Sequence, residues 1–211
     1  MLKSLPARQR GITLIESLVA IVVMALGVLG ILGVQMRTLA DTQTGVRRAQ
    51  AIRLMEDLSE RIRVSPRGLS QLTSYTGGWG ATPDLSGNCV ARACSSAELA
   101  LYDKNLWLST VQQSLPLGDA AVFLAADETD ASNRRQLGVM ISWRENEKAT
   151  AGETASDQIA YKAQLQPAST GGAAISCPPD RSCHLQYLQP SARCLPYSSG
   201  DPTQSLAICP G

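Results

Sequence analysis

An apolar stretch near the N-terminus, from Ile12 to Met36, constrains this chain more than any other feature, and it holds a single ionisable residue, Glu16. About 20 apolar residues are enough for a helix to cross a bilayer. A carboxylate within such a helix costs roughly 2.5–3.5 kcal/mol on insertion scales. We therefore expect Glu16 to have a partner that offsets this cost.

The residues before the apolar stretch are basic, with Lys3, Arg8 and Arg10. An ordinary secretory signal also begins with basic residues, but its apolar core has only about 7–15 residues and ends in a small-x-small cleavage site. The stretch here is longer, contains Glu16 and has no Ala-x-Ala exit. A plain membrane anchor would leave Glu16 unexplained.

The sequence Gly11-Ile12-Thr13-Leu14-Ile15-Glu16, preceded by the short basic leader, resembles the class III signal of type IV pilins and type II secretion pseudopilins. The resemblance implies that a prepilin peptidase removes residues 1–11, cutting between Gly11 and Ile12, and methylates the new amino group of Ile12. Phenylalanine is usual at the position of Ile12, and many pilins carry a proline that is lacking here.

Cleavage after Gly11 would create an ammonium group at Ile12, one helical turn before Glu16. Opposite charges can neutralise each other in a dry helix bundle, whereas either charge alone is costly to bury. Glu16 is thus interpreted as an assembly residue that meets the amino terminus of an adjacent subunit.

The proline-free sequence from Ile12 to Val64, stopped by Pro66, predicts one long helix over 12–64. Residues 12–36 form its transmembrane half and residues 37–64 its amphipathic half. At 100° per residue, the amphipathic half gathers its apolar residues on one narrow face. This predicted face consists of Ala51, Leu54, Met55, Leu58 and Ile62.

All six cysteines lie beyond residue 88, which favours disulfides in an oxidising compartment. A zinc site is the alternative, but the chain has no C-x2-C pair and only one histidine. Six cysteines allow 15 pairings, of which we choose the three local pairs. These pairs are Cys89–Cys94, Cys177–Cys183 and Cys194–Cys209. Arg37, Arg47 and Arg48 follow the span, so charge counting does not settle the topology, but the cysteines place the C-terminal part outside the cytoplasm.

Residues 65–211 are expected to form an extracytoplasmic α/β head. Its pattern predicts an irregular loop over 66–95, a helix over 97–114 with its N-cap at Ser95-Ser96, and strands over 120–125, 136–144 and 158–166. The predicted apolar face of the helix consists of Leu99, Tyr102, Leu106 and Val111. Alternation along the strands predicts an antiparallel sheet with one buried and one solvated face, the buried face packing on the helix face at 51–62. The tail from Pro167 shows little pattern. The fold class is therefore α+β.

Several segments of the head resemble the PilV type of minor pilin, the type IV pilus modification protein. They are Cys94 to Leu99, Tyr102-Asp103, Trp107, Leu115 to Gly118 and Ile141-Ser142-Trp143. With the N-terminal signal, the resemblance covers residues 8–145. It implies a type IV pilin-like fold and a minor pilin that helps to prime pilus assembly, in a tip complex with other minor pilins and in contact with the major pilin.

The resemblance also implies a single-pass protein of the bacterial inner membrane with its head in the periplasm, which enters the pilus at the cell surface after processing. A minor pseudopilin of type II secretion shares the same signal and stays open as an alternative. A membrane-anchored adhesin or DNA-uptake receptor is a second alternative, although it would not need Glu16. Nothing in the sequence suggests a cofactor or a small-molecule substrate.

Catalytic chemistry is not indicated, because no nucleophile-and-base set or phosphate-binding loop is present. The net charge of +1 gives no electrostatic case for nucleic acid as the main partner. His184 is expected to be structural or solvated, and Arg47-Arg48 a solvated helix face in preference to a DNA or lipid contact. One acidic cluster has the oxygen ligands that calcium prefers, but a solvated hairpin loop is the favoured interpretation of it. This cluster consists of Asp127, Glu128 and Asp130.

Overall fold

The computed structural model describes residues 11, 13–65, 67–130, 134–145, 154, 156 and 166–191, together with the backbone of 195–198 and 205–208. The leader up to Arg10, Ile12, most of the predicted strand 158–166, Cys194 and Cys209 lie outside these residues. The chain divides into two compact units, Met1–Thr44 and Gly45–Gly211. The division falls within the predicted amphipathic half of the long helix.

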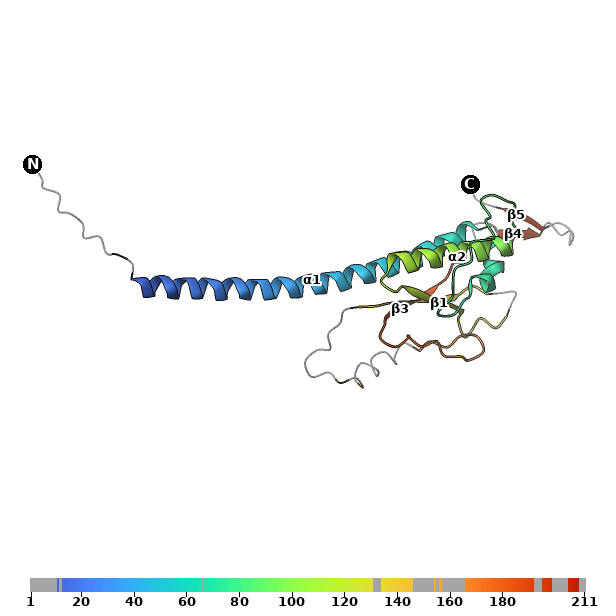
Figure 1. The fold of residues 1–211 in the computed structure, drawn as a ribbon. Coiled ribbons are helices and arrows are strands. Elements are labelled where there is room, and N and C mark those ends of the chain that lie inside the picture. Colours follow the sequence, from blue (N-terminus) through green and yellow to red (C-terminus); the bar gives the residue numbers. More distant parts are fainter. Residues whose placement is uncertain are drawn as a thin grey trace, which may run out of the picture. The chain divides into compact units, whose positions relative to one another are not determined.

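Helix α1 covers Leu14–Val64, within the predicted range of 12–64 (Figure 1). In the first unit all of its side chains are exposed. It is the one helix among the described residues that is long and apolar enough to cross a membrane. Since no residue of this part of α1 is buried by the chain itself, the apolar side chains need an environment supplied from elsewhere.

In the second unit, one face of α1 is buried, and its five residues are those predicted from the helical period. They are Ala51, Leu54, Met55, Leu58 and Ile62. Helix α2, Ser96–Ser114, runs alongside this part of α1 (Figure 1). The indole N–H of the buried Trp107 donates a hydrogen bond to the Leu54 carbonyl over 2.6 Å, which fixes α2 against α1.

The start of α2 confirms the predicted cap, because Ser95 and Glu98 form a complete capping box. The predicted apolar face of α2 is wrong except for Val111. Leu99, Tyr102 and Leu106 are only half-buried. The true buried face is centred on Trp107, whose bulk and hydrogen bond to α1 set the rotation of the helix. The buried residues of α2 are Ala100, Asn105, Trp107, Leu108 and Val111.

The three-stranded antiparallel sheet consists of β1, Asp119–Leu124, then β2, Leu137–Trp143, then β3, Ser182–Leu188. In its register, Val122 lies opposite Val139, and Val139 lies opposite Gln186. A separate two-stranded sheet pairs β4, Leu195–Ser198, with β5, Ser205–Ile208. The helix-plus-antiparallel-sheet architecture confirms the α+β fold class.

Four elements were not predicted: η1, β3, β4 and β5. A 3-10 helix, η1, covers Gly68–Tyr75 inside the segment expected to be an irregular loop. Strand β3 lies in the tail that showed little pattern. Its core-facing positions, in register with Ile141 and Val139, are occupied by His184 and Gln186. Polar residues on the inward face hide the alternation by which a half-buried strand is recognised.

The expectation of one solvated sheet face is also wrong for β2, in which every residue is buried. Leu137, Val139, Ile141 and Trp143 join the core formed with the helices. On the opposite face, Met140 and Ser142 are fully buried as well. A Cβ at Gly138 would lie 2.3 Å from the Phe123 ring, so this glycine gives the ring its place on that face. The second face of β2 is covered in part by the Phe123 ring, which lies against Gly138.

Candidate assembly surfaces

The N-terminus of α1 contains a local cap around Glu16. The Glu16 N–H donates to the Thr13 carbonyl over 3.1 Å and lies 3.4 Å from the Thr13 hydroxyl oxygen. Thr13 is thus the missed residue of this site, and the signal for it was the Thr-x-x-Glu spacing of a capping box. Glu16 lies in the first turn of α1, where a negative charge is favourable.

The Glu16 carboxylate makes no hydrogen bond or ion pair in the part of the chain that the structure describes, and its side chain is exposed. Gly11 is exposed too, and a Cβ there would meet no atom within 4 Å. Ile12, the predicted methylation site, lies outside the described residues. Within this chain, Glu16 is therefore available to a partner from outside.

The apolar surface that follows Glu16 is continuous around the helix. Its large side chains are between 48% and 80% exposed from Leu14 to Met36. Isolated exposed apolar residues are normal, but a contiguous apolar surface of this extent marks a membrane or protein contact. The first unit therefore consists of a surface that requires partners.

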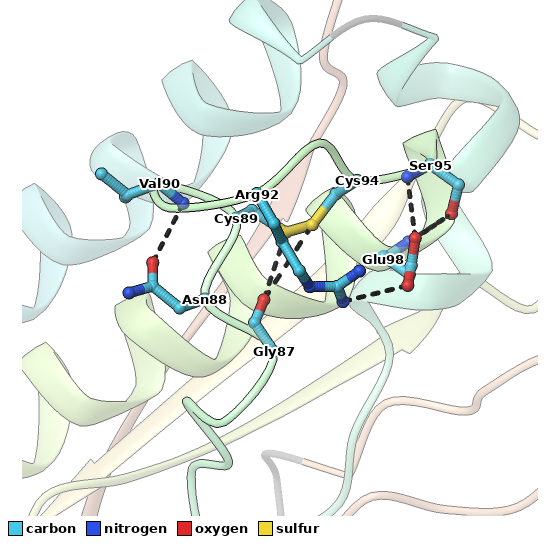
Figure 2. Close-up of a disulfide and its surroundings, with 8 residues drawn as sticks. All are labelled: Gly87, Asn88, Cys89, Val90, Arg92, Cys94, Ser95 and Glu98. Carbon is cyan, nitrogen blue, oxygen red and sulfur yellow. Dashed lines mark hydrogen bonds and ion pairs between the residues drawn. A yellow bond between two sulfur atoms is a disulfide. The ribbon is translucent and has the colours of Figure 1, made fainter.

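A second exposed feature is the loop closed by the Cys89–Cys94 disulfide, which leads directly into α2 (Figure 2). The Val90 N–H donates to the Asn88 side-chain oxygen over 3.0 Å. The Arg92 guanidinium pairs with Glu98 of α2 over 3.0 Å. The Arg92–Glu98 pair therefore ties the loop to the helix, while the Val90 side chain is 85% exposed.

Glu98 connects the loop to the helix cap. Its carboxylate accepts hydrogen bonds from both the backbone N–H and the hydroxyl of Ser95, each over 2.8 Å. These bonds, first the backbone one, and then the Arg92 guanidinium lower the pKa of Glu98 to about 2. Glu98 is thus a structural carboxylate, ionised at neutral pH.

The Cys177–Cys183 disulfide closes a loop that enters β3. The Ser182 hydroxyl donates to Glu145 over 2.8 Å, and the Trp79 indole donates to the Ser176 carbonyl over 3.1 Å. The Arg181 guanidinium donates to the Leu117 carbonyl. These contacts attach the otherwise patternless tail to the head. The predicted Cys194–Cys209 pair lies outside the described residues.

The remaining candidate residues have structural surroundings. His184 is half-buried on β3, where burial and then the charge of Arg48 lower its pKa. Arg47, expected to be solvated, is half-buried and donates to the Arg144 carbonyl over 3.1 Å. Glu128 of the acidic cluster accepts a hydrogen bond from the Arg135 N–H. Among the described residues no group of three His, Cys, Asp or Glu side chains could hold a metal ion.

Comparison with known proteins gives two family matches. A model described as the prokaryotic N-terminal methylation motif matches residues 6–32, and one described as type IV pilin Tt1218 matches residues 33–105. The first match contains Gly11, Ile12 and Glu16, and the second extends through the Cys89–Cys94 loop into α2. Neither curated proteins nor solved structures give a match.

Proposed function

Because the chain belongs to the type IV pilin superfamily, we propose that it is a minor pilin, which helps to start pilus assembly in a complex with other minor pilins. Members of this superfamily are structural subunits that are processed by a prepilin peptidase and assemble with other pilins. The minor role, the tip position and the PilV type belong to the proposal.

One observation carries the proposal: Glu16 is an exposed carboxylate in a continuous apolar surface, and no described residue pairs with it. In a helix bundle this surface would be buried, and the carboxylate would then need a positive partner. The ammonium group that cleavage after Gly11 creates on Ile12 of a neighbouring subunit is such a partner. Glu16 would therefore set the register between subunits.

The proposed localisation follows from the same arrangement. The apolar part of α1 holds the subunit in the inner membrane before assembly, and the head, with its disulfides at Cys89–Cys94 and Cys177–Cys183, lies in the periplasm. Extraction from the membrane exchanges lipid for neighbouring helices around the same side chains. The head then contacts other pilins at the cell surface.

The test compares Glu16→Ala with Glu56→Ala, which removes an exposed carboxylate from the head part of the same helix. Each variant is expressed in a strain that lacks the protein, and its amounts in sheared filaments and in the membrane fraction are measured. We expect Glu16→Ala to lower filament incorporation about tenfold or more, because the partner ammonium is left buried and unpaired. Its membrane content and the behaviour of Glu56→Ala should match the wild type.

Equal incorporation of Glu16→Ala and wild type would contradict the role of Glu16. The minor role is tested by the ratio of this chain to the main filament subunit, which should be far below one, while deletion of the chain should reduce the number of filaments. A ratio near one would identify a major pilin. Normal piliation with a loss of protein secretion would instead support the type II pseudopilin alternative.

A further inference from the structure

One end of the head brings together four arginines from separate stretches of the chain. The Arg47 guanidinium donates to the Arg144 carbonyl over 3.1 Å, and the Arg181 guanidinium donates to the Leu117 carbonyl. The Arg144 N–H donates to the Pro116 carbonyl over 2.9 Å. Together with Arg48, these residues form what we call the basic end of the head, and all of them belong to the second unit.

The exposed charge at the basic end is mainly positive. The side chains of Arg48 and Arg144 are exposed, and neither guanidinium forms a hydrogen bond or ion pair with a described residue. Two carboxylates at this end, Glu145 and Asp119, are half-buried and accept hydrogen bonds from the head itself. Asp180 is the exposed carboxylate that remains there among the described residues. The two exposed arginines are therefore available to an anionic partner from outside.

The basic end also presents an apolar side chain from a strained backbone position. Leu117 is 59% exposed, and its φ is 49°, in the left-handed region that bulky residues rarely adopt. The next residue, Gly118, packs closely, because a Cβ there would lie 2.4 Å from the Val111 carbonyl oxygen. Glycine at position 117 would relieve the strain. The stability of the head therefore does not explain an exposed leucine at this position, and strained residues of this kind cluster at functional sites.

We propose that the basic end docks on the surface of an anionic bilayer, with Leu117 among the lipid headgroups and Arg48 and Arg144 paired with lipid phosphates. Apolar side chains beside basic ones are the combination with which proteins bind anionic membrane surfaces. The length of α1 between Met36 and Arg47 is about 16 Å as a helix. This link keeps the basic end near the headgroup layer at any angle that the head adopts.

Docking would hold the head on the membrane before assembly, and extraction into a filament would release it. The proposal rests on the proposed function in one respect, which is the insertion of the apolar part of α1 into the bilayer. It does not depend on the minor role or on the pairing of Glu16.

The test uses the full-length chain in nanodiscs made of phosphatidylcholine alone or with about 30% phosphatidylglycerol, whose headgroup is anionic. A fluorescent noncanonical amino acid replaces the exposed Gln113, in the last turn of α2, and transfers energy to acceptors on lipid headgroups. We expect the transfer efficiency to be at least about 1.5-fold higher in the anionic discs and to lose this rise in about 1 M salt, which screens charges beyond about 3 Å.

The variant Arg48→Gln/Arg144→Gln removes the two exposed charges and keeps the hydrogen bonds that Arg47 and Arg181 make at the basic end. Each basic side chain near an anionic surface contributes about a fivefold preference for it, so this variant should lose most of the rise. The matched variant Arg63→Gln/Arg67→Gln, at exposed positions beyond the last buried residue of α1, should keep it.

A third variant, Leu117→Gly, separates docking from a structural role. It should reduce the rise in energy transfer, because apolar surface is lost from the contact. Its midpoint in urea unfolding should be equal to or above that of the wild type, because glycine adopts the left-handed conformation without strain. A lower midpoint with an unchanged rise would show that Leu117 serves the head alone, which contradicts its place in the docking surface.

Equal transfer in both kinds of disc, or a full rise in Arg48→Gln/Arg144→Gln, would overturn the docking and leave the proposed function intact. A wild-type chain that enters neither disc would overturn the docking and the membrane insertion together. Reduced filament incorporation of Arg48→Gln/Arg144→Gln, without a lipid-dependent rise in the wild type, would assign the basic end to a neighbouring subunit instead of the bilayer.

Discussion

The two parts of helix α1 have the same period and opposite surroundings. Leu58, in the second unit, is fully buried, whereas Leu29, in the first, is 63% exposed. Both are leucines inside one continuous helix, so the difference arises from what the rest of the chain supplies. The head covers one face of its part of α1 with α2 and the sheet, while the apolar part needs lipid or other subunits on every face.

This difference separates folding from assembly within one helix. Burial in the head stabilises the chain as a monomer, because the core is closed by elements of the same chain. Burial of the apolar part can only stabilise a membrane-bound or assembled state. Substitutions in the two parts should therefore affect different measurements.

The largest expected effect compares Leu58→Ala with Leu29→Ala. Removal of the buried Leu58 side chain should lower the free energy of unfolding of the head by about 3 kcal/mol, as is typical of fully buried leucines. Leu29→Ala should leave this value within about 0.5 kcal/mol of the wild type. Urea unfolding of the full-length chain in micelles can be followed by tryptophan fluorescence, since all three tryptophans, Trp79, Trp107 and Trp143, are in the head.

A similar loss of head stability in both leucine variants would show that the two parts of α1 are not energetically separate. The comparison also has a second arm, because Leu29→Ala removes apolar surface from the assembling part. Its incorporation into filaments should therefore fall, while the free energy of unfolding of its head stays near the wild-type value.

A smaller effect is expected from opening the loop that precedes α2. The double variant Cys89→Ser/Cys94→Ser should lower the free energy of unfolding of the head by about 2 kcal/mol, because the disulfide closes only a short loop and the entropic gain grows with loop length. Reduction of the wild type breaks the Cys177–Cys183 disulfide as well, and it should lower the free energy of unfolding of the head by a larger amount. Unfolding of the double variant at the wild-type urea midpoint would show that the Arg92–Glu98 pair holds the loop without the disulfide.

The smallest effect concerns the cap of α2 and its dependence on pH. The pKa of Glu98 in the folded head is about 2, below its ordinary value of 4.5. The ionised Glu98 therefore contributes its full stabilisation of the head above pH 4.5, and this contribution is lost as the pH falls from 4.5 towards 2. Ser95→Ala should cost about 1 kcal/mol at pH 7 and make the melting temperature less sensitive to acid over this range.

Ser114→Ala, at the exposed C-terminal end of the same helix, is the control for Ser95→Ala and should keep the wild-type pH profile. If Ser95→Ala lost as much stability between pH 4.5 and 2 as the wild type, the Ser95 hydroxyl would have no part in the acid sensitivity of the head.

Local rules predicted the parts of this fold in which one side chain pattern decides the outcome. The helical period located the buried face of α1 down to its five residues, and the Ser-x-x-Glu spacing located the cap of α2. The period failed in α2, where a hydrogen bond from Trp107 to Leu54 sets the rotation. That bond joins residues 53 positions apart, which no local pattern reports.

The sheet shows the same limit. The alternation along β2 predicts the strand. Burial of its second face, at Gly138 and Met140, depends on residues distant in the sequence, among them Phe123, whose ring lies against Gly138. Strand β3 was missed, because it presents His184 and Gln186 at core-facing positions. At the N-terminus, the apolar run makes Glu16 conspicuous as a lone charge, whereas the bond of its N–H to the Thr13 hydroxyl depends only on the local Thr-x-x-Glu spacing.

The central claim, that the apolar part of α1 is an assembly surface created by processing, is tested most directly by mass spectrometry of the mature N-terminus. The protein is isolated from membranes and from sheared filaments, and its N-terminal peptide is sequenced. We predict a chain that begins at N-methylated Ile12 in both fractions. An intact Met1, or a new terminus near residue 36, would contradict the claim, because the ammonium group proposed to pair with Glu16 would then not exist at this position.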